Sequence, residues 1–188
     1  LLYEFGATFR AGRVAGLAEI RTRMAELEDV LPHAMICSLQ DQLQRIDTLE
    51  QDIDRLEQRM SAWQKQEAEC RAIAEVPGIG KLTATALVAT MGDVKTFKSG
   101  REFASFLGLV PRQSGTGGKI RLGAISKRGD PYLRTLLIHG ARSVMYHAKA
   151  PPAWQLEIQA RRPANVAAVA LAHKMARTAW AILAHGQK

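Results

Sequence analysis

Residues 108–130 read GLVPRQSGTGGKIRLGAISKRGD and interrupt a chain that is otherwise patterned for helices. Glycines and basic residues crowd this segment, and neither a helical nor a strand period runs through it. We therefore expect a long basic loop, with a short β-ribbon around Lys119–Leu122. The less specific alternative is a flexible loop that is only solvated. Glycine-rich backbone can lie close to a sugar–phosphate chain, and the cations that would contact its phosphates are Arg112, Lys119, Arg121, Lys127 and Arg128.

Helical patterning surrounds this loop on both sides. Asp130 precedes Pro131, which is typical of a helix N-cap followed by proline in the first turn. Pro163 and Gly186 bound a final, Ala-rich helix. No β-alternation of useful length appears, so the sequence predicts a mostly α fold, with helices at Leu82–Met91, Gly100–Gly108, Pro131–Ala148, Ala153–Ala160 and Asn165–Ala184.

A second motif precedes the loop. Residues 73–91 combine an apolar helix end, the turn VPGIG at 76–80 and a helix that opens with small residues. This pattern resembles a helix-hairpin-helix module, in which glycines permit a tight turn and free N–H groups bind a phosphate oxygen without reading bases. The alternative is an ordinary interhelical turn. A Walker A loop is excluded, because Leu82 and not Ser or Thr follows Lys81.

The first part of the chain carries apolar stripes at helical spacing. Leu17–Leu31 forms one stripe that ends at Pro32, and Ile46–Trp63 forms a cleaner heptad pattern with apolar a and d positions. The heptads last less than three repeats, so two arrangements remain open. They form either a coiled coil between chains, which makes the protein a homo-oligomer, or an antiparallel hairpin within one chain.

Charge changes along the chain near residue 73. Residues 1–72 hold 9 basic and 13 acidic side chains, a net −4, whereas residues 73–188 hold 17 basic and 5 acidic ones, a net +12. We place a domain boundary there, between a helical coiled-coil region (1–72) and a second domain (73–188). The basic excess of the second domain predicts a polyanionic partner, either nucleic acid or an anionic membrane surface.

Several classes of protein are disfavoured by what the sequence lacks. No apolar run approaches the length of a membrane span, and residues 1–20 carry charges where a signal peptide has its apolar core. Cys37 and Cys70 stand alone, so neither a disulfide framework nor a zinc site is indicated. We expect a soluble, cytoplasmic protein with no membrane partner.

Four motifs in a fixed order carry a family resemblance. They are VPGIG at 76–80, FASFLGLVPR at 103–112, GGK at 117–119 and ISKRGDPYLR at 125–134. Together they closely resemble the C-terminal half of insertion-sequence transposases of the one-ten family, eleven-eleven subgroup. These enzymes are DEDD recombinases related to the pilin-gene invertase. The resemblance covers residues 73–148.

The resemblance implies a two-part enzyme with a coiled coil between its parts. The N-terminal part would be RuvC-like, with four acidic ligands for a divalent metal (Mg), and the C-terminal part would be the present helical transposase domain. The sequence begins at Leu1 without a methionine, so we expect a fragment that lacks the acidic half, holds no metal or cofactor and is inactive alone. The family recombines DNA under the direction of a structured guide RNA, which implies both partners and a bacterial, nucleoid-associated location.

The family also uses a serine of this loop, immediately before a glycine, to attack the DNA backbone. Aligned on GGK at 117–119, the corresponding residue is Thr116, but Ser114 also precedes a glycine. A hydroxyl beside glycine can approach a phosphate closely and form a covalent phosphoester. Thr116 is favoured by position and Ser114 by residue type, so both stay candidates.

Other residues are predicted to bind nucleic acid without reacting. Two alternatives without catalysis remain: a helix-hairpin-helix binding module and a dimerisation module built on the heptads. On the last helix, Lys174 and Arg177 face either solvent or RNA, while Trp154 and Trp180 are expected in the core. The predicted contacts are Gly78, Gly80, Lys81, Arg112, Gly117, Gly118, Lys119, Arg121, Lys127, Arg128 and Arg134.

Overall fold

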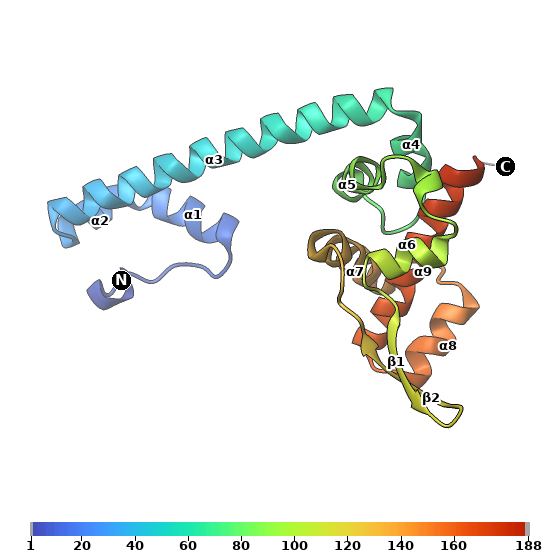
Figure 1. Cartoon of the computed structure of the whole chain (residues 1–188). Helices are drawn as coiled ribbons and strands as arrows, with labels where there is room; N and C mark the ends of the chain where they lie inside the picture. The colour runs from blue at the N-terminus through green and yellow to red at the C-terminus, as the bar shows by residue number, and fades with distance from the viewer. Residues whose placement is uncertain (1, 187–188) are drawn as a thin grey trace. The chain divides into compact units, whose positions relative to one another are not determined.

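The computed structural model describes residues 2–186 and divides into two compact units, Leu1–Glu57 and Gln58–Lys188 (Figure 1). Helices make up most of the described chain, which confirms the predicted mostly α fold. The boundary between the units falls inside the longest helix, α3. In order, the elements are η1 (Leu2–Phe5), α1 (Arg13–Thr22), α2 (Met24–Val30), α3 (His33–Gln66), α4 (Ala68–Ala74), α5 (Lys81–Met91), η2 (Val94–Thr96), α6 (Gly100–Phe106), β1 (Pro111–Thr116), β2 (Lys119–Ile125), α7 (Pro131–His147), α8 (Ala153–Arg161) and α9 (Ala164–His185).

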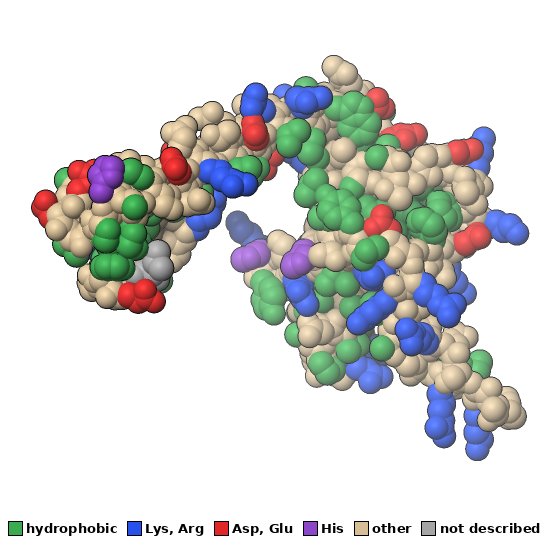
Figure 2. Space-filling view, turned by 60° about the vertical axis from the view of Figure 1, so that its left-hand side comes forward, with side chains coloured by type: hydrophobic (Ala, Val, Ile, Leu, Met, Phe, Trp, Pro, Cys, Tyr) green, Lys and Arg blue, Asp and Glu red, His purple; other side chains and the backbone are tan. Residues whose placement is uncertain are grey.

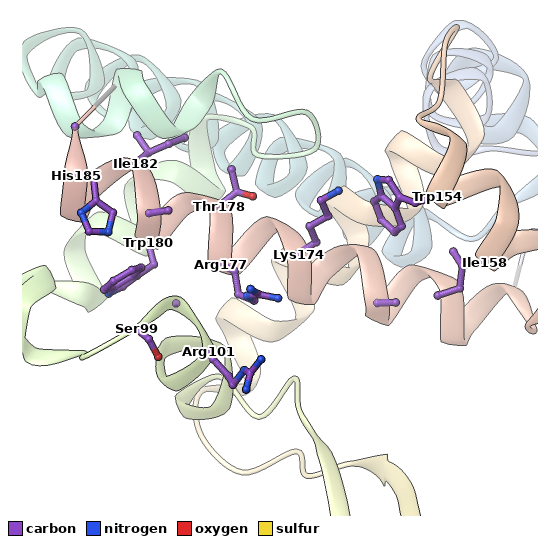
Figure 3. Close-up of a pocket in the computed structure, with 14 residues that line it drawn as sticks. Ser99, Arg101, Trp154, Ile158, Lys174, Arg177, Thr178, Trp180, Ile182 and His185 are labelled. Atoms are coloured by element: carbon purple, nitrogen blue, oxygen red, sulfur yellow. The ribbon is translucent and has the colours of Figure 1, made fainter. Parts of the chain in front are cut away.

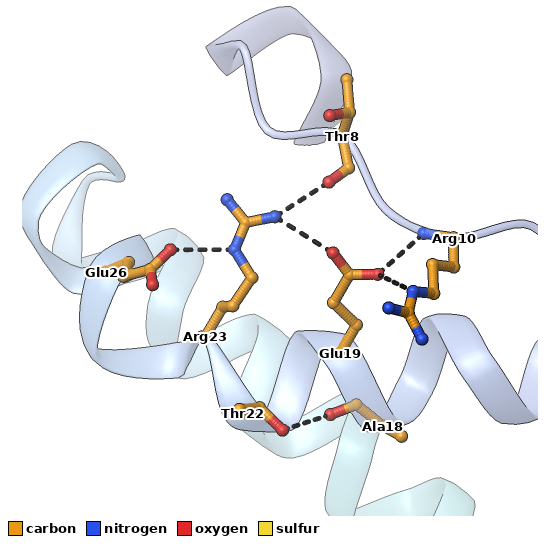
Figure 4. A network of polar contacts seen from close by, with 7 residues as sticks. All are labelled: Thr8, Arg10, Ala18, Glu19, Thr22, Arg23 and Glu26. Carbon is orange, nitrogen blue, oxygen red and sulfur yellow. Dashed lines mark hydrogen bonds and ion pairs between the residues drawn. The ribbon is translucent and has the colours of Figure 1, made fainter.

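Arg23 holds the corner between α1 and α2 in the first unit. Its guanidinium donates to the carbonyl oxygen of Thr8 at 2.9 Å, to Glu26 at 2.8 Å and to Glu19 at 3.4 Å (Figure 4). The prediction of one helix over Leu17–Leu31 is therefore wrong. The backbone of Arg23, with φ −97° and ψ 16°, leaves the helical region while its side chain ties both short helices to the preceding segment.

Side-chain ion pairs join α1 to α3. Arg13 donates to Glu50 at 2.6 Å, and Arg21, two turns further along α1, donates to Asp47. The partners run in opposite order along the two helices, so the helices are antiparallel. These ion pairs agree with the intramolecular alternative for the beginning of the heptad pattern.

The apolar side chains in the middle of the heptad pattern are exposed to solvent. Leu49, Ile53 and Leu56 are each slightly more than half exposed. Their apolar surface therefore has no complete partner among the described residues. A coiled coil between chains remains a prediction for these a and d positions.

The central element of the second unit is α9. It packs against α7, α6, α4 and α8, and its buried stripe from Ala167 to Ala179 consists mainly of alanines, which let the neighbouring helices approach closely. By length and composition α9 could also cross a membrane, so the expectation that no such apolar run exists is corrected. Its buried face against four helices is that of a core helix.

Two glycines permit the chain to cross itself between α6 and α7. Gly108 and Gly129 adopt positive φ angles of 70° and 98°. A Cβ atom on Gly129 would lie 1.7 Å from the carbonyl oxygen of Phe106, a distance that no side chain can accommodate. We call this crossing of residues 106–108 with residues 127–129 the glycine clamp.

Hydrogen bonds extend the glycine clamp in both directions. The N–H of Lys127 donates to the carbonyl of Gly108 at 3.1 Å, and the N–H of Ser126 donates to the carbonyl of Val110 at 2.8 Å. Directly after the clamp, the carboxylate of Asp130 accepts two N–H groups of the first turn of α7, at 2.7 and 3.2 Å. The predicted N-cap is confirmed, and the segment between α6 and α7 is fixed at both ends.

We predict that Gly129→Ala lowers the free energy of unfolding by about 3 kcal/mol, because left-handed strain and overpacking each cost about 1–3 kcal/mol. Gly123→Ala is the matched control, since an added Cβ there has its nearest neighbour at 3.8 Å. Chemical denaturation of both variants measures the difference. Equal stability of the two variants would contradict the role of the clamp.

Self-association is predicted to depend on the heptad positions. Replacement of Ile46, Ile53 and Leu56 with Gln should dissociate an oligomer, because these residues form an uninterrupted apolar seam. Sedimentation measures the mass of each variant. Val30→Gln is the control, since Val30 is comparably exposed but lies outside the heptads. A parent chain that is monomeric at high micromolar concentration would show that the seam does not join copies of this chain.

Candidate nucleic-acid interface

The segment expected to be a long loop contains a β-hairpin instead. β1 and β2 pair antiparallel and form the two-stranded sheet of the second unit. The turn between them is Gly117-Gly118, whose φ angles of 59° and 79° suit a two-residue turn that follows the twist of a hairpin. The ribbon around Lys119–Leu122 is confirmed, but β1 was missed because its Pro, Ser and Gly residues have weak strand propensity. We call Pro111–Ile125 the basic hairpin.

One face of the basic hairpin carries both candidate nucleophiles. Thr116 lies opposite Lys119, and Ser114 lies opposite Arg121. Opposite and alternate residues of an antiparallel pair share a face, so two hydroxyls and two cations lie together. All four residues are exposed, and Lys and Arg side chains project from the end of the second unit (Figure 2). A phosphate held by these cations would lie near a hydroxyl.

The other predicted cations of this region lie at the base of the basic hairpin. Arg112 donates to the carbonyl of Ser126 at 3.3 Å, and Arg134, which is half-buried, donates to the carbonyl of Leu107 at 3.1 Å. Arg134 thus supports the glycine clamp directly, and Arg112 binds the residue that precedes the second segment of the clamp. Lys127 and Arg128 are exposed on the clamp itself.

The turn at residues 76–80 joins α4 to α5, which pack against each other. Gly80 is exposed, and no atom lies within 4 Å of the position that a Cβ would take there. No side chain caps α5 at Gly80, so the N–H groups of the first turn of α5 are available to an anion. The module type remains a prediction, but the geometry suits a backbone contact.

Two predicted contacts of this turn have neighbours within the protein. The carbonyl oxygen of Gly78 faces α7, where a Cβ on Gly140 would lie 2.0 Å from it. The ammonium group of Lys81 donates to the hydroxyl of Ser61 at 3.2 Å. Gly78 therefore serves the packing of the turn, while Gly80 is the glycine that is open to a ligand. Figure 1 shows this turn and the basic hairpin at opposite ends of the second unit.

The described residues assemble no metal centre, and the buried thiol of Cys70 is unreactive. Within residues 2–186, no three His, Cys, Asp or Glu side chains lie together so that they could hold a metal ion. Burial raises the pKa of the Cys70 thiol to about 11, with a smaller contribution from Glu67 and Glu69. This thiol stays protonated near neutral pH and is a poor nucleophile.

A third group of functional candidates includes Lys174 and Arg177, which the sequence placed toward either solvent or RNA, and Arg101, which the sequence analysis missed. Arg101, at the start of α6, lies near Lys174 and Arg177 of α9 around a surface hollow (Figure 3). Lys174 and Arg177 have the spacing of one helix face, but nothing in the sequence connects them to Arg101. Trp154 and Trp180, which were expected in the core, are only partly buried and line the same hollow.

Comparison with known families identifies the domain that contains these features. Residues 70–156 match the model of the Transposase IS116/IS110/IS902 family. This chain contains a transposase domain of that family. The matched residues of the transposase domain include the turn at 76–80, the glycine clamp and the basic hairpin, so the resemblance carried by the four sequence motifs is confirmed.

Curated relatives extend the similarity over nearly the whole chain. A probable family 20 transposase of Pseudomonas aeruginosa is 48% identical over 188 residues, which are 97% of this chain and 56% of that protein. The transposase for insertion sequence element IS1111A of Coxiella burnetii is 36% identical over 191 residues, or 97% of this chain and 51% of that protein. The pilin gene-inverting protein of Moraxella lacunata is 36% identical over 75 residues, 39% of this chain and 23% of that protein. The chain thus spans about half the length of the first two relatives.

We predict that duplex DNA binding falls steeply with salt and depends on the cations of the hairpin and clamp. Each phosphate neutralised changes the slope of log K against log salt by about 0.9. Replacement of Arg121, Lys127 and Arg128 with Glu should abolish binding, as measured by fluorescence anisotropy of a labelled duplex at several salt concentrations.

The matched control for this experiment makes the same change of net charge elsewhere. Arg45, Arg59 and Lys65 are exposed on α3, and their replacement with Glu should leave most of the affinity. A flat salt response of the parent chain, or equal losses in the two triple variants, would contradict the assignment.

Proposed function

We propose that the chain acts in DNA transposition or recombination by binding the DNA backbone and supplying a hydroxyl nucleophile. Membership of the transposase family supports the general role. The observation that carries the specific role is the shared face of the basic hairpin, where Ser114 and Thr116 lie opposite Arg121 and Lys119. Cations that hold a phosphate beside an exposed hydroxyl are what a strand-cleaving nucleophile requires.

The proposed reaction is a transesterification at phosphorus. The hydroxyl oxygen forms a bond to the phosphorus atom of the scissile phosphate, and the bond to the leaving deoxyribose oxygen breaks. The nucleophile loses its proton and the leaving oxygen gains one, so the phosphodiester becomes a protein–DNA phosphoester. Attack by the freed hydroxyl of another strand reverses these changes and rejoins DNA. Lys119 and Arg121 would balance the charge on the phosphate oxygens.

Position on the hairpin favours Thr116 as the nucleophile, whereas the type of hydroxyl favours Ser114. Thr116 is the last residue of β1 and adjoins the turn, so it lies at the projecting end of the basic hairpin. Ser114 lies within the strand and has a primary hydroxyl, which is less hindered than the β-branched hydroxyl of threonine. Both residues therefore remain in the proposal, and a chemical experiment distinguishes them.

The remaining surfaces of the chain would position the nucleic acid. Gly80 and the first turn of α5 provide N–H groups for a backbone contact, and the exposed Ile120 and Leu122, on the other face of the hairpin, can pack against sugars and base edges. A structured guide RNA is part of the proposal, as are a homo-oligomer through the heptads and a bacterial, nucleoid-associated location. The divalent metal implied by the family resemblance would be held by the acidic residues of an N-terminal part and not by the transposase domain.

A second candidate function is a binding module without catalysis. This function is supported as well as the first by the exposed cations, because phosphate contacts alone require no hydroxyl. These cations are Lys119, Arg121, Lys127 and Arg128. The two functions differ in what happens when a hydroxyl is removed. Binding would be unaffected in both cases, but only a nucleophile would lose covalent chemistry.

We predict that one of the single variants Thr116→Ala and Ser114→Ala, tested in a protein of the full length of the relatives, eliminates covalent protein–DNA adducts. DNA and RNA binding should stay close to that of the parent, since neither change alters net charge or helix packing. The measurement is retention of a labelled DNA strand on denatured protein.

Thr116→Ser is the control for position. It should retain or increase adduct formation if Thr116 is the nucleophile, because the hydroxyl stays and the methyl group is lost. Adducts that persist in both alanine variants would show that neither hydroxyl attacks, and would leave the binding module as the function of the hairpin.

A further inference from the structure

A groove runs along α9 on a part of the second unit that the proposed chemistry does not use. Its walls are α9, the beginning of α6 and α8, and its volume is about 1610 Å³ (Figure 3). Pockets for drug-sized ligands usually enclose about 300–1,000 Å³. We call it the α9 groove. Its volume exceeds that range and suits a chain-like ligand better than a small molecule.

The charge of the α9 groove is positive. Arg101, Lys174 and Arg177 line it, whereas no Asp or Glu does. All ion pairs found among residues 2–186 join residues between Arg10 and Arg55, so these three cations have no carboxylate partner in the described structure. Figure 3 shows the side chains of Arg101 and Arg177 directed into the same space. Such unneutralised cations attract phosphate groups.

A histidine beside the groove is influenced by the positive charge of the two arginines. His173, on α9, has its pKa lowered, first by burial and then by the charges of Arg177 and Arg101. Protonation of His173 is disfavoured mainly because the ring is partly buried, and the nearby positive charge adds to this effect. Both arginines therefore lie close enough to His173 to influence it.

Aromatic rings stand beside these cations. The ammonium group of Lys174 lies 4.1 Å from the ring centre of Trp154, and the ring of Trp180 meets that of His185 edge-on at 5.5 Å. Both tryptophans also pack against the hydrophobic core, so their rings are held in place. Fixed rings next to arginine and lysine are the usual platform for unpaired bases.

We propose that the α9 groove binds single-stranded nucleic acid. Arg101 and Arg177 would contact successive phosphates. Lys174 would move from the ring of Trp154 to a third phosphate, and bases would then pack on Trp154 and Trp180. A duplex suits this groove less well, because its bases are stacked inside and cannot reach the rings. The groove would thus hold an unpaired strand, of DNA or RNA, while the basic hairpin contacts a duplex; this role is independent of the hydroxyls on the hairpin.

The first experiment removes two phosphate contacts from the 188-residue chain. Labelled 12-nucleotide single strands of DNA and RNA, and a DNA duplex of equal length, are titrated with the parent and with Arg101→Ala/Arg177→Ala. The variant should bind its preferred single strand at least tenfold more weakly. Its slope of log K against log salt should fall by about 1.4, since each single-strand contact contributes about 0.7. Its affinity for the duplex should change less than twofold.

The matched control removes two cations outside the groove. Arg161 and Arg162 are exposed at the end of α8, and Arg161→Ala/Arg162→Ala should leave single-strand binding within twofold of the parent. Equal losses in the two double variants would overturn the proposal, because net charge alone would then explain binding. Unchanged single-strand binding in Arg101→Ala/Arg177→Ala would overturn it as well.

The second experiment tests the aromatic part without altering the protein. A 12-nucleotide strand with abasic sites keeps its phosphates but lacks the bases that would stack. The parent chain should bind it at least fivefold more weakly than the intact strand. Equal affinity for the two strands would overturn base packing in the α9 groove. Covalent adduct formation by the hairpin hydroxyls is read separately, so either proposal can fail without the other.

Discussion

The glycine clamp is the contact on which the presentation of the basic hairpin depends. The carbonyl oxygen of Phe106 occupies the space that a side chain at Gly129 would need, and Gly108 meets the opposite segment in the same way. Because these two segments cross so closely, β1, which follows residues 106–108, and β2, which precedes residues 127–129, must lie side by side there. The two-residue turn then closes a hairpin whose strands are otherwise almost fully exposed and have no core to support them.

The helices around the clamp supply the rigidity that the hairpin lacks. α6 ends at the clamp and packs on α9, while α7 begins just after it with Asp130 as its N-cap and packs on α9 as well. The alanines of α9 allow this close packing from several sides. A side chain on the exposed hairpin is therefore carried by a well-packed base, which is the arrangement expected for a site that must meet a large ligand.

Particular residues show which elements could be predicted from the sequence and which could not. The helical periods predicted α5, α6, α7, α8 and α9 to within two residues of the observed bounds, because their apolar positions, prolines and caps are local signals. The single helix expected over Leu17–Leu31 is wrong, since Arg23 at the corner is tied to the carbonyl oxygen of Thr8, 15 residues earlier, and no helical period reveals that contact. The sequence analysis missed β1 for a related reason. Its residues have weak strand propensity, which is overcome by pairing with β2 and by the glycine clamp.

The sequence by itself determined the mostly α fold, the order of the motifs and the uneven charge, because these follow from residue type and spacing, whereas the two candidate hydroxyls came from the family resemblance that the motifs carry. Only the tertiary structure decided which residues share a surface. Register placed Ser114 and Thr116 on one face with Arg121 and Lys119, and packing of α6 on α9 brought Arg101 to Arg177 across a long separation in sequence. Such neighbours arise from chain crossings and helix packing, which depend on contacts between distant residues and leave no periodic trace in the sequence.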